Sequence, residues 1–226
     1  MSDGEVLHGD AFDLLDTLPE GHGHAAVVDF PWEYGNGKET GRAGLRHGME
    51  WDMGDNDAFE TAIELLADAV VDGGWVFAFA DDPVLPEFRS AVEETLTYRK
   101  TLIWDTKYFG NGHYFRSRHQ YVIAATNGET DRYAQSTPTV IQHAAESRKN
   151  GGETRYPTEK PSDLYRDLLA EVVEPGERVL EPFCGTAPAY AAASQLGADY
   201  WGCDVSEDAI KFAKERGGQS RAEAFL

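Results

Sequence analysis

The sequence of 226 residues is poor in cysteine and in basic residues, and it has no long apolar run. Its two cysteines, Cys184 and Cys203, are too few for a disulfide framework and have no metal-ligand spacing with any histidine pair. No apolar run reaches the about 18 residues that a membrane-spanning helix needs. The segment Met1–Asp10 lacks the basic and then apolar pattern of a secretory signal. We therefore expect a soluble, cytoplasmic protein with one domain over residues 1–226 and no bound metal.

Acidic residues outnumber basic ones: 40 Asp and Glu stand against 20 Lys and Arg, with a formal net charge of -20 and a pI near 4.6. Taken alone, this charge argues against nucleic-acid binding. The acids are dispersed along the chain, however, and the basic residues are 13 Arg and 7 Lys, which together suggest a halophilic source. In molar salt the Debye length is about 3 Å, so repulsion from phosphates is largely screened. Acidity therefore does not exclude a DNA partner.

Strand-like and helix-like segments alternate along almost the whole chain, which is typical of an α/β fold. Seven apolar runs have the length of strands: Glu5–His8, Ala25–Phe30, Trp75–Ala80, Thr101–Trp104, Gln120–Ala125, Arg178–Phe183 and Tyr200–Val205. Helical patterns lie between them at Phe59–Val71, Pro83–Leu96, Ser162–Val173, Ala187–Leu196 and Glu207–Arg216. We expect a doubly wound, mostly parallel seven-stranded sheet.

Two stretches interrupt this alternation. Glu33–Asp57 is rich in glycine and polar residues and is too long for a simple connection. Glu129–Tyr156 has only weak periodicity. We expect the first to be a mobile catalytic loop and the second a short recognition insertion.

A strand that runs into a turn of small residues and then into a helix is expected over Val179–Ala187. Such a turn lets a ligand approach the backbone closely. About 20 residues later the next strand ends in Asp204, whose carboxylate can accept hydrogen bonds from both ribose hydroxyls of a nucleoside. The turn lacks the G-x-G-x-x-G spacing that a dinucleotide pyrophosphate needs. A nucleoside without phosphates, such as S-adenosylmethionine, therefore fits better than NAD, although the turn by itself is equally typical of ordinary strand-to-helix connections.

The segment Asp29-Phe30-Pro31-Trp32 directly follows the apolar strand Ala25–Val28, where a sheet of this kind presents its active site. Methylation of an adenine N6 amine needs hydrogen-bond acceptors that draw the nitrogen toward tetrahedral geometry. The Asp29 side chain and the Phe30 carbonyl can supply them, while Pro31 fixes the turn and Trp32 stacks on a flipped base. The alternative is a strand-ending turn with a packed tryptophan.

These motifs resemble those of amino-methyltransferases. Asp29–Trp32 resembles the family's Asp-Pro-Pro-Tyr/Trp signature, and Glu181–Thr186 resembles its Asp-Pro-Phe-x-Gly-Ser/Thr cofactor turn. Their order looks like the circularly permuted β class of DNA N6-adenine and N4-cytosine methyltransferases. Tyr156–Pro161 is similar to that class's His-Pro-Thr-Gln-Lys-Pro, and Gly9-Asp10-Ala11 matches a Gly-Asp that contacts the cofactor. Gly110–Gln120 looks like a Gly-x-Gly-x-x-x-Arg-x-x-His-Glu stretch of MT-A70-like adenine methyltransferases.

The resemblance implies a Rossmann-like domain that uses S-adenosylmethionine and methylates N6 of adenine in DNA by direct in-line transfer to a flipped base. The residues it implies for the cofactor are Asp10, Ala11, Lys160, Glu181, Phe183, Cys184, Gly185, Thr186, Asp204 and Val205. Asp29 favours adenine, because N4-cytosine enzymes of this class more often carry Ser there. A homodimer is expected from the class.

This sequence departs from the family pattern at three places. Phe30 replaces the first proline of the signature, so the ring no longer restricts φ there. The second glycine of the cofactor turn is missing, and Pro188 stands in the first turn of the following helix. Gln120 occupies a position where the family often has Glu. The first two departures motivate a rival hypothesis, a catalytically silent, nucleic-acid-binding partner subunit.

Lys107–Arg118 holds three basic residues and no acid, interleaved with four aromatic residues, a composition that suits phosphate contact and base stacking. The alternative is a loop whose aromatic residues pack into the core. The candidate nucleic-acid contacts are Arg42, Arg46, Lys107, Tyr114, Arg116, Arg118, Arg148 and Lys149. DNA is favoured over RNA, and N4-cytosine or RNA adenine methylation remain alternatives. A 5-methylcytosine mechanism needs a nucleophilic cysteine in the catalytic loop, which neither cysteine supplies.

Overall fold

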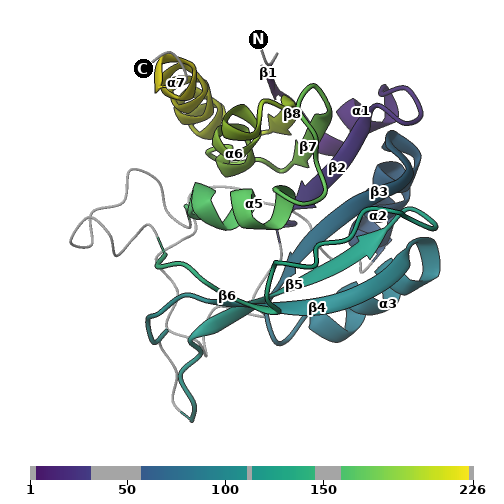
Figure 1. Ribbon diagram of the computed structural model, residues 1–226, viewed down its shortest axis with the longest axis vertical. Coiled ribbons are helices and arrows are strands. Elements are labelled where there is room, and N and C mark those ends of the chain that lie inside the picture. The colour runs from purple at the N-terminus through teal and green to yellow at the C-terminus, as the bar shows by residue number, and fades with distance from the viewer. Residues whose placement is uncertain (1–3, 32–56, 111–113, 146–158, 224–226) are drawn as a thin grey trace.

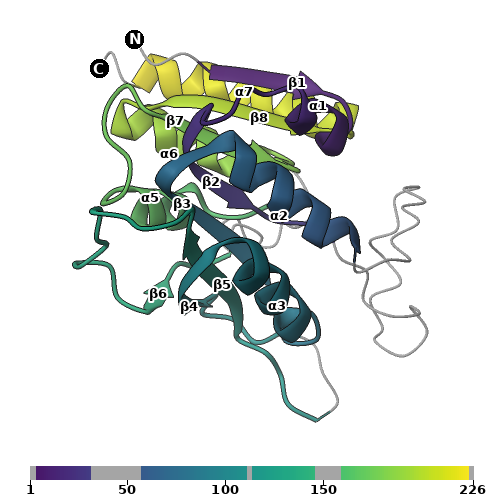
Figure 2. The ribbon, with the colours of Figure 1, turned by 90° about the vertical axis from the view of Figure 1, so that its right-hand side faces the viewer.

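Eight strands form one mixed sheet between two layers of helices in the computed structural model, which describes residues 4–31, 57–110, 114–145 and 159–223 (Figures 1 and 2). The strands are β1 (Gly4–His8), β2 (Gly23–Val28), β3 (Val70–Ala80), β4 (Thr97–Asp105), β5 (His119–Thr126), β6 (Val140–Gln142), β7 (Arg178–Pro182) and β8 (Asp199–Asp204). The helices are α1 (Ala11–Asp16), α2 (Asp57–Ala69), α3 (Leu85–Thr95), α5 (Ser162–Leu169), α6 (Pro188–Leu196) and α7 (Glu207–Glu223).

The strand order β1-β8-β7-β2-β3-β5-β4-β6 places the last two strands of the sequence inside the sheet, between β1 and β2. From β1 through β3 every neighbouring pair is parallel, whereas β5 runs antiparallel to both β3 and β4 (Figure 1). The carboxyl ends of β1, β8, β7, β2 and β3 therefore meet at one edge of the sheet. This arrangement confirms the doubly wound, permuted α/β fold expected from the motif order.

The central strands are buried on both faces, as parallel strands between helices must be. In β2, Ala25 and Val27 pack into the cluster under α5, α6 and α7, while Ala26 and Val28 pack into the cluster under α1, α2 and α3. Figure 2 shows α5 and α6 on one side of the sheet and α2 and α3 on the other. Such strands present only their ends to a ligand.

Three details of the expected secondary structure were wrong. The described sheet has eight strands instead of seven, because β6, only three residues long, joins the edge of β4 in parallel and is too short to carry a pattern. The six-residue helix α1 was missed, although Asp10 caps it by accepting a 2.8 Å hydrogen bond from the Phe12 backbone N–H. The helix expected to reach Val71 ends at Ala69, and β3 begins at Val70, because Val70 pairs with Gly23 of β2.

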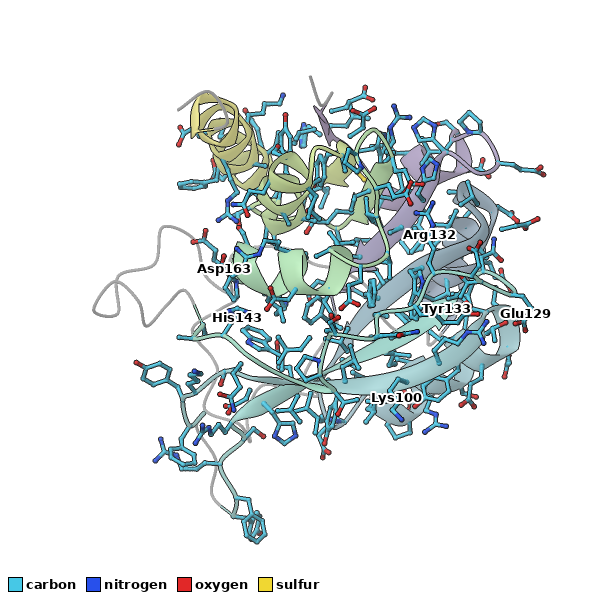
Figure 3. All side chains as sticks on the ribbon, viewed as in Figure 1. Lys100, Glu129, Arg132, Tyr133, His143 and Asp163 are labelled. Atoms are coloured by element: carbon cyan, nitrogen blue, oxygen red, sulfur yellow. The ribbon has the colours of Figure 1, made fainter. Side chains whose placement is uncertain are left out.

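The described part of the expected recognition insertion, residues 129–145, is held against the sheet and α5. Arg132 forms an ion pair with Glu177 and donates a 3.1 Å hydrogen bond to the Val172 carbonyl. Nε2 of His143 lies 2.7 Å from Oδ2 of Asp167 in α5. Figure 3 shows Glu129 and Arg132 at one end of this segment and His143 at the other. A recognition role for residues 146–156 stays a prediction, because they lie outside the described residues.

Candidate active site

The motif residues from four strands converge at the carboxyl edge of the sheet. Asp29 follows β2, the turn of Cys184 and Gly185 follows β7, and Asp204 ends β8. Gly9, after β1, donates a 3.1 Å hydrogen bond to the Asp204 carbonyl, which holds that strand end beside β8. Ligands of open α/β sheets bind in this crevice, at the strand ends.

Asp29 forms an ion pair with Lys160, which precedes α5 and lies 131 positions away in sequence. The Lys160 side chain is only 8% exposed, and its Nζ lies 4.9 Å from the centre of the Phe79 ring on β3. A buried ammonium needs such a partner, because an unpaired charge is costly in the interior. The Asp29 side chain, at 31% exposure, is thereby held in one position while staying accessible from the edge.

Phe30 is buried among phenylalanines from three other elements, which accounts for its presence where the family signature has proline. Its ring centre lies 5.1 Å from that of Phe183, 5.4 Å from Phe59 and 5.9 Å from Phe88, each in an edge-to-face arrangement. Such pairs add stabilisation beyond the burial of their area. Side-chain packing therefore anchors the chain after β2, in place of a proline ring. Pro31 is the last described residue here, and Trp32 lies outside the described residues.

The turn from β7 to α6 has a left-handed backbone at alternate positions: φ is +58° at Phe183, +50° at Gly185 and +52° at Ala187. Ala187 thus adopts the conformation of the missing family glycine, at a cost of order 1 kcal/mol. A Cβ atom added to Gly185 would meet no heavy atom within 4 Å. The turn therefore leaves an open cradle above Gly185, which fits a ligand that approaches the backbone closely.

Asp204 borders this cradle. Its Oδ2 accepts a 2.8 Å hydrogen bond from the Gly185 N–H, and its Oδ1 accepts one of 2.8 Å from the Ser206 N–H. Burial raises the pKa of this carboxyl group, and the backbone hydrogen bonds oppose that rise. A carboxylate can accept about four hydrogen bonds, so Asp204 can accept further ones beside those from the backbone. The exposed apolar side chain of Val205 stands next to it.

Glu181 does not reach the cradle. Its carboxyl group is buried, where it accepts a 2.7 Å hydrogen bond from the Tyr200 hydroxyl and longer ones from the Ala189 N–H at the start of α6. Burial raises its pKa well above the usual range. Glu181 therefore ties α6 to the sheet, and its contact with a cofactor stays a prediction. Cys184 and Thr186 of the turn are likewise buried, and burial raises the pKa of the Cys184 thiol.

The loop between β4 and β5 carries the basic and aromatic residues expected to contact nucleic acid. Tyr114 and Phe115 are 97% and 95% exposed, so they do not pack into the core. Arg116 lies over the ring of Phe109 and donates a 2.8 Å hydrogen bond to the Gly110 carbonyl. Arg118 forms two hydrogen bonds with Asp105, which lower the pKa of that carboxyl group.

Arg116 and Arg118 therefore stabilise the conformation of this loop through contacts within it. Lys107 has a left-handed φ of +61°. The other candidate contacts, Arg42, Arg46, Arg148 and Lys149, lie outside the described residues, as does the expected mobile loop except Asp57. The structure also adds residues that the motifs did not indicate: Asp81 and Asp82 follow β3 at the same edge. Their position directly after a buried apolar strand is the sequence pattern that could have indicated them.

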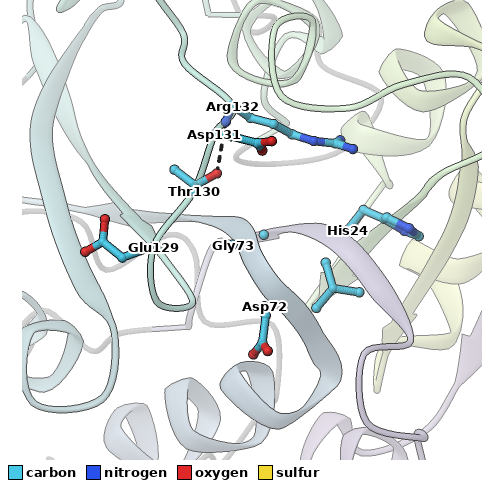
Figure 4. Close-up of a pocket in the computed structure, with 9 residues that line it drawn as sticks. His24, Asp72, Gly73, Glu129, Thr130, Asp131 and Arg132 are labelled. Atoms are coloured by element: carbon cyan, nitrogen blue, oxygen red, sulfur yellow. Dashed lines mark hydrogen bonds between the residues drawn. The ribbon is translucent and has the colours of Figure 1, made fainter.

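A separate cavity of about 480 Å³ lies at the opposite, amino edge of the sheet (Figure 4). It is lined by His24 at the start of β2, Asp72 and Gly73 of β3, and residues 129–132. Figure 4 shows Asp72 on one side of Gly73 and Thr130 on the other. Because the motif residues gather at the carboxyl edge, this cavity is not part of the candidate site.

No group of His, Cys, Asp or Glu among the described residues has a metal-binding arrangement, and none of the described helices is long and apolar enough to cross a membrane.

Replacing Gly185 with alanine tests the cradle. The added methyl group meets no atom of the described fold, so only the left-handed φ costs stability, about 1 kcal/mol. We expect ligand affinity at the turn to fall at least about tenfold in a calorimetric titration, because the methyl group occupies the space that the ligand needs. Gly176→Ala is the matched control: its φ is +87° and its surroundings are equally open, but it precedes β7. Equal affinities in the two variants would contradict a ligand site above Gly185.

Comparison with known proteins agrees with the fold. A family model described as DNA methylase, of the N6/N4 methyltransferase type, matches residues 34–215. YubD of Escherichia coli (strain K12), a protein named as a methylase, is 28% identical to this chain over 123 residues. The match covers 54% of this chain and 50% of YubD, so the chain spans about half the length of this curated relative.

Two solved structures share the fold at low sequence identity. The complex of M1.HpyAVI with S-adenosylmethionine superposes with a TM-score of 0.72 at 16% identity, covering 94% of this chain and 98% of that one. The cytosine-N4-specific PvuII DNA methyltransferase superposes with a TM-score of 0.75 at 13% identity, covering 96% and 86%. Since the family model spans most of the sequence, the chain belongs to the N6/N4 DNA methylase family.

Proposed function

We propose that this protein transfers a methyl group from S-adenosylmethionine to the exocyclic N6 amine of adenine in DNA. The observation that carries the proposal is the placement of Asp29, held by Lys160 at the end of β2, beside the open turn at the end of β7. A hydrogen-bond acceptor and a nucleoside cradle thus lie on neighbouring strands. Methyl transfer to an amine needs this proximity.

The described residues fit S-adenosylmethionine in chemistry as well as in position. Asp204 offers free lone pairs for the ribose hydroxyls, Gly185 leaves room for close approach, and the exposed Val205 offers an apolar surface for the adenine ring. Asp10 stands at the neighbouring strand end, after β1. The cofactor supplies a methyl group activated on a positively charged sulfur.

The chain itself supplies orientation and electrostatics. Lys160 occupies Oδ2 of Asp29, so the other carboxylate oxygen is the one that can accept a hydrogen bond from the target amine. With the Phe30 carbonyl as a second acceptor, the amine is drawn toward tetrahedral geometry and its lone pair is directed at the methyl group. No covalent enzyme intermediate is needed.

Adenine is the proposed base because position 29 carries Asp, whereas Ser is more usual in the N4-cytosine enzymes that the motifs resemble. N4-cytosine methylation is the rival function, supported by the fold shared with the cytosine-N4-specific PvuII enzyme. Both bases present an amine to the same acceptors, so only the product separates these two functions.

DNA contact is proposed for the loop between β4 and β5, whose exposed aromatic rings offer stacking surfaces. Replacing both Tyr114 and Phe115 with alanine is expected to weaken DNA binding at least tenfold, because each stacked base contributes about 1–3 kcal/mol. Fluorescence anisotropy with duplex DNA measures this affinity, and S-adenosylmethionine affinity and the melting temperature should stay unchanged. Tyr133→Ala, which removes another exposed ring from the distant amino edge (Figure 3), is the control. Equal DNA affinity in the double variant and the control would remove the loop from the interface.

Incubation with S-adenosylmethionine carrying a labelled methyl group, in parallel with duplex DNA and RNA, tests the proposed function. The assay uses about 2 M KCl, because the acidic composition favours a high-salt source and such salt screens repulsion from phosphates. Label in DNA alone supports the proposal, and label in RNA alone redirects it to RNA. Cofactor binding without transfer to either polymer would instead favour a silent partner subunit, the rival motivated by Phe30 and the missing glycine.

A further inference from the structure

A second carboxyl group stands at the proposed transfer site, on the strand next to Asp29. Val28 of β2 is paired with Ala78 of β3, so the strands end side by side, and β3 continues through Phe79 and Ala80 to Asp81. Because side chains alternate along a strand, Asp81 is on the same face as Phe79, the ring beneath the Lys160 ammonium. Asp81 therefore lies at the same strand edge as Asp29, and the charges of both Asp29 and Lys160 act on its carboxyl group.

The backbone fixes Asp81 in place. Its carbonyl accepts hydrogen bonds of 3.1 Å from the Val84 N–H and 3.0 Å from the Leu85 N–H, which form the turn that opens α3. Its half-buried carboxyl group accepts no hydrogen bond from the described part of the chain. In contrast, Asp29 is bound to Lys160, and Asp204 accepts two backbone N–H groups. Of these three carboxyl groups, only that of Asp81 is free of a hydrogen-bonded partner among the described residues.

Methyl transfer to an amine creates a proton that must leave. The amine lone pair forms the new N–CH₃ bond, the S–CH₃ bond breaks with its electron pair going to sulfur, and the nitrogen is left with an extra hydrogen and a positive charge. Water or a side chain accepts this proton to restore the neutral amine, and a positioned carboxylate makes that transfer faster. Asp29 is less available for this step, because Lys160 binds one of its carboxylate oxygens and the target amine is proposed to bind the other.

We propose that Asp81 is the proton acceptor of the methyl-transfer site, an inference that rests on the proposed function. Its position at the end of β3, beside the end of β2, places a carboxylate at the same strand edge as the target amine. His119 begins the neighbouring strand β5, whose Tyr121 pairs with Ala80, and this half-exposed imidazole offers the proton a way to solvent.

The electrostatic surroundings suit this role. Burial raises the pKa of the Asp81 carboxyl group, which makes its carboxylate a stronger base than an exposed aspartate. The charged groups that face it are Lys160 and His119, which lower its pKa, and Asp82 and Asp29, which raise it. The carboxylate is the active form, so the rate should fall as pH decreases through this raised pKa.

The test is the single-turnover rate of methyl transfer by the full chain to duplex DNA, measured from acidic to neutral pH. Asp81→Asn is expected to lower the rate at neutral pH about 100-fold and to abolish the acidic fall in rate, while Asp81→Glu restores part of both. S-adenosylmethionine affinity and the melting temperature should stay near those of the unmodified protein, which shows that the variant is folded. Asp72→Asn, at an exposed aspartate on the opposite, amino edge of the sheet, is the matched control.

Two results would overturn the inference while leaving the proposed function in place. One is an Asp81→Asn rate within about threefold of the control. The other is a slower rate with an unchanged acidic fall, which would mean that Asp81 only orients its neighbours. If the unmodified protein transfers no methyl group to DNA, the proposed function itself fails and this inference fails with it.

Discussion

Replacing Asp29 with asparagine is expected to lower the rate of methyl transfer about 10²–10³-fold while leaving S-adenosylmethionine affinity within about twofold. Asparagine keeps the shape of the side chain and one oxygen acceptor for Lys160, but it removes the negative charge that draws on the amine hydrogens. The cofactor cradle is formed by β7 and β8, so it should be unaffected. Single-turnover kinetics and calorimetric titration of the cofactor together measure the two effects.

Asp29→Ala separates catalysis from folding. Removing the carboxyl group altogether should abolish transfer, and it also leaves the Lys160 ammonium buried without its partner, at a cost of about 3 kcal/mol of stability. The alanine variant should therefore melt at a lower temperature than the asparagine variant, although both transfer poorly. A fully active Asp29→Asn enzyme, or one that loses cofactor affinity first, would contradict the role assigned to Asp29.

Replacing Asp204 with alanine is expected to weaken S-adenosylmethionine binding at least about 100-fold. Two hydrogen bonds from ribose hydroxyls to a charged group are lost, each contributing about 1.5–3 kcal/mol. Part of the lost cofactor affinity would come from a disturbed turn, because the same carboxylate accepts hydrogen bonds from the N–H groups of Gly185 and Ser206. Equilibrium titration of the cofactor measures the change.

Asp204→Asn is the control for that structural contribution. The amide oxygen can keep one backbone hydrogen bond, so the turn should be less disturbed than in the alanine variant, while the charge that favours the ribose hydroxyls is gone. We expect intermediate affinity. Normal cofactor affinity in Asp204→Ala, together with lost transfer, would reverse the roles assigned to Asp29 and Asp204.

The fold and the strand ends that carry the site were predictable from the sequence, because they depend on local patterns. An apolar run such as Ala25–Phe30 is typical of a buried strand, and the order of the motifs indicated the permuted class. The cradle at Gly185 was likewise expected from its turn of small residues. Short elements could not be predicted from the sequence. Strand β6, with its three residues, forms only because it pairs with β4.

Side-chain partners were not predictable, because they depend on packing between distant segments. No spacing rule connects Lys160 with Asp29, and only the closure of the segment before α5 over β3 brings them together. Phe30 departs from the family motif, and only its contacts with Phe59, Phe88 and Phe183 explain why a phenylalanine stands there. Glu181 was expected at the cofactor, but its burial beneath α6 became visible only in the assembled fold.

Asp29 and the Gly185 turn are proposed to act together on an adenine amine in DNA. Nucleoside mass spectrometry of unmethylated duplex DNA, after incubation with the protein and S-adenosylmethionine in concentrated KCl, tests this proposal. We expect N6-methyldeoxyadenosine as the product, and we expect none when Asp29→Asn replaces the unmodified protein. N4-methyldeoxycytidine as the product, or N6-methyldeoxyadenosine formed equally by both proteins, would contradict it.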